Sequence, residues 1–136
     1  MNTYGRDEAE WDLLTDEGLA FLIEQAKLKR ITSYTELNAT LARRTGLRPF
    51  NFERDIDRAA MGQLLGRIVE RNLPETGFMI SALVVYLNEN DAGSGFYAFA
   101  KELGKLSNSA SSAEKWEFWL GQVAKAHEFY GSPTRR

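Results

Sequence analysis

The stretch FMISALVVYL occupies residues 78–87 and is apolar at both its odd and its even positions. Its adjacent valines, Val84 and Val85, and its aromatic residues are typical of β-strands. Apolar side chains at both parities predict a strand covered on both faces, and a buried helix is the alternative interpretation. Because one strand cannot form a sheet alone, it must pair with residues 31–32, with a segment expected to be a loop, or with another chain.

Three helices are predicted on the N-terminal side of this strand. The first has Thr15 as its N-cap, and the second begins with a capping box in which Ser33 is the N-cap and Glu36 the partner. The third is expected to end just before Pro74, because proline cannot continue the hydrogen-bond ladder. The predicted ranges are 16–30, 34–45 and 53–71.

Two more helices are predicted after the strand, over residues 96–103 and 113–130. The sequence NENDAGSG, residues 88–95, is expected to turn the chain from strand to helix, with Gly93 and Gly95 allowing a close approach of the backbone. The serine-rich residues 107–112 are typical of a flexible connector.

This order of elements predicts a single domain over residues 1–136, mainly α (α+β), with one or two short strands and with residues 1–12 flexible. Three helices, a short early strand and a later strand form the outline of a winged helix-turn-helix domain. The helix over 113–130 is then an addition at the C-terminus. Because three-helix folds also bind proteins, this outline alone does not define the function.

Composition excludes several classes of protein. The chain has no cysteine, which excludes disulfides, a thiolate nucleophile and a Cys-ligated zinc site. It has no apolar stretch of membrane-spanning length, so we expect no membrane association. The acidic, polar N-terminus lacks the basic-then-apolar order of a signal peptide, and a cytoplasmic location is therefore expected.

Charge is unevenly distributed along the chain, whose net charge is −2. Residues 1–26 hold one arginine against seven acidic residues, a net charge of −6. Residues 27–71 hold ten basic residues against five acidic ones, a net charge of +5. The weakly acidic whole argues against strong non-specific binding of nucleic acid, while the basic middle allows local binding. A solvated helical surface is the competing interpretation of the basic segment.

Few side chains suit catalysis or metal binding. The single histidine, His127, lies on the apolar stripe of the last predicted helix and is expected to be packed and hydrogen-bonded. Glu53, Asp55 and Asp57 lie where the helix dipole favours acids, which favours a structural role over a metal or acid–base role. The glycines of residues 93–95 lack the patterns of a P-loop or a dinucleotide turn, although a phosphate-binding nest stays open. We expect no cofactor and no metal.

Four segments match the motifs of one family in residue type. They are SYTEL (33–37), DRAAMG (57–62), ISALVV (80–85) and GSGFY (93–97). In this order they resemble the DNA-binding domain of the O6-alkylguanine-DNA alkyltransferases and the alkyltransferase-like proteins. The resemblance covers about residues 31–103, and the predicted C-terminal helix has no obvious counterpart in the family.

The resemblance implies a DNA-binding fold without the family's chemistry. The reactive cysteine of the family would fall on Ser81 and its activating histidine on Ala82. Alkyl transfer needs a thiolate and a base to form it, so this chain would be a non-catalytic relative. By the same resemblance, Tyr34 would lie near a DNA phosphate and Arg58 would reach into the duplex.

The first hypothesis for function is a non-enzymatic module or regulator that binds duplex DNA through the basic segment 27–71. The helices over 34–45 and 53–71 would form the helix-turn-helix pair. Phosphate and groove contacts would come from Tyr34, Arg43, Arg44, Arg48, Arg54 and Arg58. A contiguous positive face would favour this hypothesis, and arginines paired with nearby acids would favour a solvated surface.

The second hypothesis is a protein-interaction module, such as a small regulator or inhibitor. It would use the acidic N-terminus and the aromatic last helix, with Trp116 and Trp119 contacting a partner or a second copy of the chain. An enzyme is the third alternative. Only a carboxylate-based hydrolase or nuclease would be consistent with the side chains present, and no residues can be assigned to it.

Overall fold

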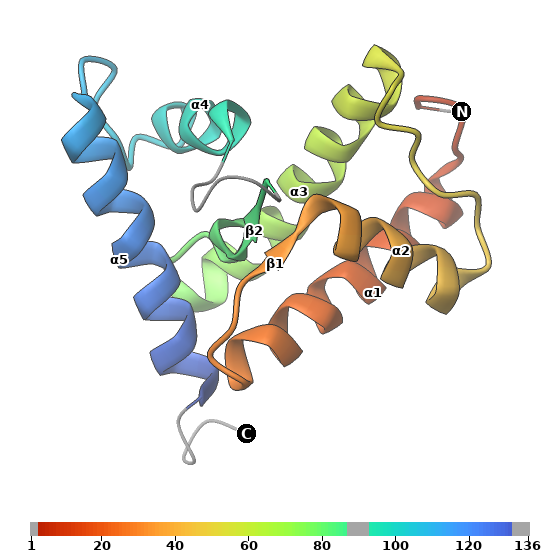
Figure 1. The fold of residues 1–136 in the computed structure, drawn as a ribbon, viewed down its shortest axis with the longest axis horizontal. Helices are drawn as coiled ribbons and strands as arrows, with labels where there is room; N and C mark the ends of the chain where they lie inside the picture. Colours follow the sequence, from red (N-terminus) through yellow and green to blue (C-terminus); the bar gives the residue numbers. More distant parts are fainter. Residues whose placement is uncertain (1–2, 87–92, 132–136) are drawn as a thin grey trace.

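The computed structural model describes residues 3–86 and 93–131. It is mainly helical, with one small parallel sheet, as the predicted fold class requires (Figure 1). The helices are α1 (Glu8–Lys27), α2 (Tyr34–Thr45), α3 (Asp55–Thr76), α4 (Ser94–Glu102) and α5 (Ser112–Gly131). A 3₁₀ turn, η1 (Ile80–Leu83), precedes strand β2 (Val84–Val85), which pairs with strand β1 (Thr32–Ser33).

The first helix begins earlier than predicted, and Thr15 is not its N-cap. Asp7 caps α1 in a capping box: its carboxylate accepts from the Glu10 N–H at 2.8 Å, and its own N–H donates to Glu10 Oε1 at 3.0 Å. Two reciprocal bonds outweigh the single bond that Thr15 could offer, and Thr15 is instead buried within the helix. Residues 8–12, expected to be flexible, are therefore the first turns of α1, and Trp11 is fully buried there.

The second helix has the predicted bounds, but the third does not. Ser33 caps α2 by accepting from the Glu36 N–H at 3.0 Å. Helix α3 continues past Pro74, which removes only one N–H from its last turn. Gly77, with φ of 81°, ends the helix because its left-handed conformation turns the chain away.

Most of the predicted strand over 78–87 is not a strand. Residue 87 lies outside the described part, and of residues 78–86 only 84–85 form a strand, which pairs in parallel with β1 in the register Thr32 to Val84 and Ser33 to Val85. The early segment is thus the sheet partner, which was one of the three alternatives. Residues 78–85 are all buried, so the apolar pattern predicted burial correctly. It could not predict the 3₁₀ turn, whose backbone is hydrogen-bonded by side chains of α3 and α5.

The two later helices agree with the prediction to within two residues at each end. Gly93 is the N-cap of α4, and Gly104, with φ of 74°, turns the chain after it. Of the predicted turn over residues 88–95, residues 88–92 lie outside the described part. Residues 107–111 connect α4 to α5 without helical structure, as expected for the connector.

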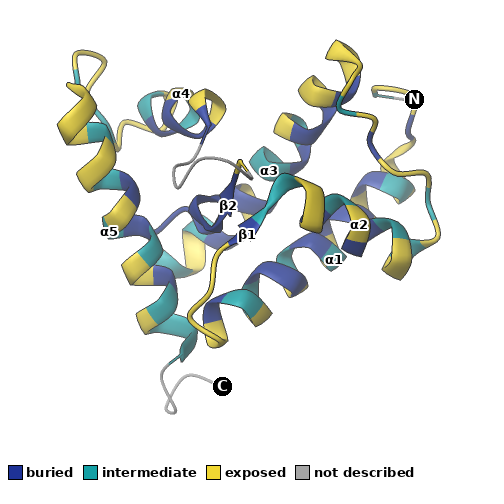
Figure 2. Cartoon of the chain, viewed as in Figure 1, coloured by how far each residue is buried: buried dark blue, intermediate teal, exposed yellow. Residues whose placement is uncertain are grey.

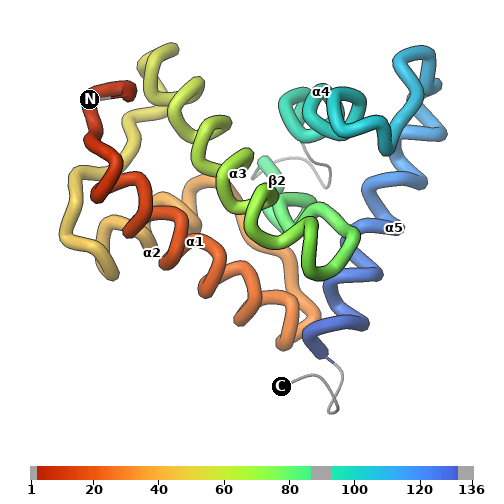
Figure 3. The backbone as a smooth tube through the Cα atoms, turned by 180° about the vertical axis from the view of Figure 1, so that it is seen from behind, coloured from red at the N-terminus to blue at the C-terminus, as the bar shows by residue number. Residues whose placement is uncertain are grey.

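Helix α1 is the centre of the packing, since it contacts α2, α3, η1 and α5. Figure 3 shows α1, α2 and α3 on one side of the molecule, with α4 and α5 on the other. Buried residues gather where these elements face one another, and α5 keeps a long exposed side (Figure 2). Among residues 3–86 and 93–131, no helix is both long enough and apolar enough to cross a membrane.

Candidate functional site

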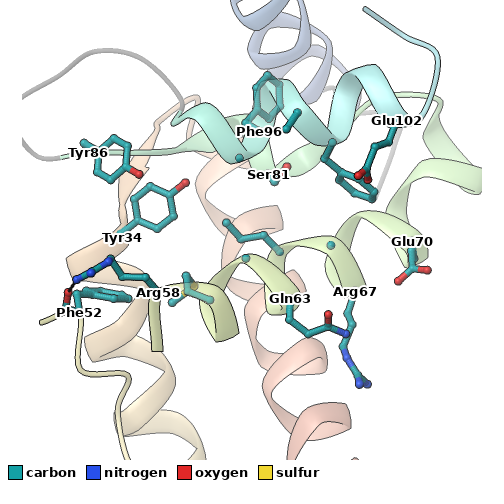
Figure 4. A pocket seen from close by; sticks show the side chains of 17 residues that line it. Tyr34, Phe52, Arg58, Gln63, Arg67, Glu70, Ser81, Tyr86, Phe96 and Glu102 are labelled. Carbon is teal, nitrogen blue, oxygen red and sulfur yellow. Dashed lines mark hydrogen bonds between the residues drawn. The ribbon is translucent and has the colours of Figure 1, made fainter. Parts of the chain in front are cut away.

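A cleft of about 510 Å³ lies between α3 and α4 and is the candidate site (Figure 4). Tyr34 from the start of α2, Phe52 from the loop before α3, and Tyr86 directly after β2 form one end of it. Pockets of this size are typical of sites for small ligands or single groups of a larger ligand.

Aromatic rings form the first end of the cleft. The rings of Tyr34 and Tyr86 have centroids 4.9 Å apart, and Phe52 meets Tyr34 edge to face at 6.5 Å. Burial, with the neighbouring Tyr86 as a smaller cause, raises the pKa of Tyr34 to about 12. The Tyr34 hydroxyl therefore stays protonated and neutral at physiological pH.

Charged side chains differ between the two ends. Arg58 lies at the aromatic end, where its guanidinium pairs with Asp55 and donates to the Phe52 carbonyl. Glu70 and Glu102 lie at the opposite end (Figure 4). The far end also holds Arg67, which lies beside Glu70 in Figure 4 and pairs with Glu8, so both ends of the cleft carry charges of both signs.

Three glycines lie in the walls of the cleft, Gly62 and Gly66 of α3 and Gly95 of α4. A Cβ atom added at Gly62, Gly66 or Gly95 would meet no atom within 4 Å. Ser81 of η1 also lines the cleft, between the tyrosines and Glu102 in Figure 4. Only 5% of Ser81 is exposed, and its hydroxyl is not among the buried polar atoms that lack a hydrogen-bond partner.

We expect the Gly93→Ala substitution to displace the Tyr86 ring. A Cβ at Gly93 would lie 2.6 Å from Tyr86 Cε2 and 2.8 Å from its hydroxyl, so the half-exposed ring must move away from position 93, which changes its contact with Tyr34. NMR shifts of the Tyr34 and Tyr86 ring protons measure this. Gly95→Ala is the matched control, because its added methyl meets nothing. Equal ring shifts in both variants would contradict the prediction.

Of the six residues predicted to contact DNA, the structure brings two together in the cleft, Tyr34 and Arg58. Arg43 and Arg54 are exposed and lie outside it. Arg48 donates to the Gly5 carbonyl at 3.3 Å, and Arg44 forms two bonds of 2.9 Å to Glu24. The predicted residues therefore do not form one common site.

The uneven charge of the sequence is explained by pairing of α1 with α2 and α3. Arg67 forms two bonds of 3.1 Å to Glu8, and Arg44 pairs with Glu24. Arg71 pairs with two further acids of α1, Asp12 and Asp16. Three arginines of the basic segment are thus paired with acids of the N-terminal segment.

Two of the three acids near the start of α3, Asp55 and Asp57, form contacts within the fold, as expected for a structural role. Asp55 pairs with Arg58, and Asp57 is buried and accepts from the Asn51 N–H at 2.7 Å. His127 is half-buried, and its Nε2 lies 3.0 Å from the Arg30 carbonyl, so the expected hydrogen bond is confirmed. Within residues 3–86 and 93–131, no group of three or more His, Cys, Asp or Glu could hold a metal ion.

Acidification is expected to weaken the pairing of α1 with α2. Hydrogen bonding to Arg44 holds the pKa of the Glu24 carboxyl below its ordinary value. The pair therefore stabilises the fold above the unfolded-state pKa of about 4.3, and this contribution is lost as pH falls through the lower folded-state pKa. Because the pair is exposed, its contribution is at most about 1 kcal/mol.

The measurement compares urea unfolding of the wild type and Glu24→Gln at neutral pH and over a series of decreasing pH values down to the lowest at which the wild type still folds. The difference in unfolding free energy should be present at neutral pH and absent in acid. A difference that persists in acid would show that the carboxylate charge is not its origin.

The two candidate partner-binding tryptophans occupy different environments. Trp119 is only 4% exposed, and its Nε1–H donates to the Ala82 carbonyl at 2.8 Å, so its ring is part of the core and is not presented to a partner at the surface. Trp116 is 43% exposed. The periodicity of the sequence places both tryptophans on one helix. Their difference in exposure arises only from the packing of α5 against η1.

Sequence reasoning missed Phe52, Tyr86, Glu70 and Glu102 as residues of the cleft. No local pattern marks the two glutamates, because they lie on helices that face each other only in the folded chain. Tyr86 carried a usable signal: it ends the buried run just before the glycine-containing turn.

The fold and the cleft together define a mainly α domain with an aromatic-lined candidate binding site. Comparison with models of protein families, with curated proteins and with solved structures finds no match for this chain. The function is therefore argued from the geometry of the cleft.

Proposed function

We propose that this protein is a non-enzymatic nucleic-acid-binding module of winged-helix type, and that its cleft holds an unstacked base. The observation that carries the proposal is the aromatic end of the cleft, where Tyr34, Phe52 and Tyr86 surround the same space as the Arg58 side chain. Aromatic rings stack on the faces of bases, and a guanidinium binds a phosphate. This end of the cleft therefore offers contacts for both the base and the phosphate of one nucleotide.

The ion pair of Arg58 does not prevent phosphate binding. Half of the Arg58 side chain is exposed, and Asp55 is almost fully so. Such exposed pairs contribute about 0–1 kcal/mol, whereas a phosphate offers Arg58 charge-assisted, bidentate hydrogen bonds. Exchange of Asp55 for a phosphate is therefore favourable.

Charge supports one direction of approach. Arg54 and Arg58 lie at the N-terminal end of α3, on the aromatic side of the cleft, and Arg43 is also exposed. At the far end, Glu70 and Glu102 lie with Arg67, whose guanidinium is already paired with Glu8, so this end is less suited to a phosphate. In this proposal α2 and α3 are the helix-turn-helix pair, and duplex DNA contacts the beginning of α3 rather than the whole basic segment.

The absence of chemistry and the cytoplasmic location are part of the same proposal. Ser81 lines the cleft, but among the described residues no histidine or carboxylate is hydrogen-bonded to it as a base would be. A serine without a base is a weak nucleophile. A chain without cysteine is compatible with the cytoplasm.

Fluorescence polarisation with labelled oligonucleotides tests the proposal. Single-stranded DNA and a duplex with one unpaired base should bind more tightly than a fully paired duplex, because extrusion of a paired base costs a few kcal/mol. Binding should weaken steeply as salt rises. Absence of binding to all three at low salt would exclude the proposal.

The Arg58→Gln variant should reduce the slope of log affinity against log salt by about one, since one phosphate contact is lost. Arg44→Gln is the matched control, because Arg44 pairs with Glu24 and does not line the cleft. The slope should be unchanged in the control. Equal slopes for both variants would remove Arg58 from the interface.

A protein-interaction module is the second candidate, supported by one observation on α5. Trp116 and Leu120 are each 43% exposed and lie four residues apart, on the same side of the helix. If this surface joins two copies of the chain, light scattering will show a dimer that Trp116→Ala dissociates. A monomer at all concentrations would exclude the homodimer.

A further inference from the structure

One polar side chain of the buried 3₁₀ turn, Ser81, reaches the wall of the cleft (Figure 4). Ser81 is 5% exposed, and its hydroxyl is not among the fully buried polar atoms that lack a hydrogen-bond partner. A ligand that fills the cleft therefore comes within reach of this hydroxyl. A hydroxyl can both donate and accept, so it suits several kinds of polar group.

The backbone around Ser81 is held by three buried side chains. Gln122 Oε1 of α5 accepts from the Met79 N–H at 2.8 Å. Asn72 Oδ1 of α3 accepts from the Ile80 N–H at 2.8 Å. Trp119 Nε1–H of α5 donates to the Ala82 carbonyl at 2.8 Å.

These three side chains act on the turn and not on the cleft. Asn72, Gln122 and Trp119 are each at most 4% exposed, and none of them lines the cleft. Their bonds engage backbone groups on both sides of Ser81, so the direction of its side chain is set from two helices at once. The C-terminal helix, which has no counterpart in the resemblance, thereby contributes to the site.

We propose that Ser81 determines the specificity of the cleft by hydrogen-bonding the polar edge of a flat heteroaromatic ligand. Asn72, Gln122 and Trp119 are positioning residues for it. The inference rests on the proposed function, in which this ligand is an unstacked base. The stacked faces of the base meet the aromatic rings, which leaves its edge for Ser81. Because the hydroxyl donates and accepts, Ser81 distinguishes polar from apolar edges rather than one base from another.

The first test compares two single-stranded oligonucleotides that differ in one central residue, thymine or its apolar isostere difluorotoluene. The Ser81→Ala variant should bind the thymine oligonucleotide about 3- to 10-fold more weakly than the wild type, which is the range of one neutral hydrogen bond. Its affinity for the isostere should not change. Equal losses for both oligonucleotides, or no loss for either, would overturn the role of Ser81.

The second test addresses the positioning residues. It measures the ratio of the affinity for the thymine oligonucleotide to the affinity for the isostere oligonucleotide. Gln122→Met removes the acceptor for the Met79 N–H at similar length and should lower the preference for thymine, as Ser81→Ala does. Gln122→Glu keeps an oxygen acceptor for the Met79 N–H and should retain the preference for thymine. Leu14→Ala destabilises the core of α1 and should leave the ratio unchanged. A ratio that falls equally in all three variants would show that general instability is the cause.

A small probe separates this inference from the proposed function. Pyridone is a flat ring with one donor and one acceptor, and its binding is followed by the NMR shifts of the Ser81 and Ala82 amides. If no oligonucleotide binds but pyridone shifts these amides in the wild type and not in Ser81→Ala, the proposed function fails and the inference stands. If oligonucleotides bind, but Ser81→Ala changes neither the binding of the thymine oligonucleotide nor that of pyridone, the inference fails and the proposed function stands.

Discussion

The Trp119→Ala variant is expected to lose about 3–5 kcal/mol of its free energy of unfolding. The indole is buried in the cluster that contains Val69, Met79 and Phe96, and its removal leaves a cavity there. It also leaves the Ala82 carbonyl without its donor. A domain of this size is stable by only about 5–15 kcal/mol, so the loss is a large fraction of the total.

Urea unfolding followed by circular dichroism measures this loss. Trp116→Ala is the matched control: the same residue type on the same helix, three positions earlier, with 43% of its surface exposed. It should cost less, about 0.5–1.5 kcal/mol, because the Trp116 ring packs against Trp119, with ring centroids 5.1 Å apart, but is otherwise largely exposed. Trp119→Phe keeps most of the ring and loses the donor, so it should cost about 1–3 kcal/mol even if the alanine variant does not fold. Equal losses at positions 116 and 119 would contradict the assigned environments.

The Tyr34→Ala variant is expected to bind single-stranded DNA about 5- to 150-fold more weakly, since stacking of a base on an aromatic ring contributes about 1–3 kcal/mol. Tyr34 contacts both other rings at its end of the cleft, Phe52 and Tyr86. Its removal therefore takes away one stacking ring and also removes the contact that holds the other two rings in place. Polarisation titrations at constant low salt measure the change.

Two control variants separate stacking from other roles of Tyr34. Tyr4→Ala removes a tyrosine that lies against Trp11 and does not line the cleft, so affinity should be unchanged. Tyr34→Phe removes only the hydroxyl and should retain most of the affinity. Wild-type affinity in Tyr34→Ala, with the fold intact by circular dichroism, would remove the aromatic end from the proposed interface.

Sequence reasoning succeeded where the cause of a structure lies within a few residues. Helix α2 has its predicted bounds because Ser33 caps one end and Gly46, with φ of 72°, closes the other. It failed for α1, where the Asp7–Glu10 capping box was overlooked, and for α3, where Gly77 rather than Pro74 ends the helix. These failures concern competition between local signals.

Other failures have a different cause, since no local signal exists. The side chains that bond the 3₁₀ turn are Asn72 and Gln122, respectively 8 and 43 residues away from the backbone groups that they hold. The cleft likewise joins Tyr34 to Glu102 through faces of α2, α3 and α4 that meet only after folding. Pairs at such separations depend on topology, which periodicity does not contain.

Composition and periodicity were therefore sufficient to establish a mainly helical domain, a buried run over residues 78–85 and the segregation of acidic from basic residues. Packing decided the rest. It placed the acids of α1 against the arginines of α2 and α3, and it buried Trp119 while leaving Trp116 exposed. The physical reason is that burial and pairing depend on which surfaces meet. Neighbouring residues on one helix can thus have opposite surroundings, and residues far apart in the chain can share one site.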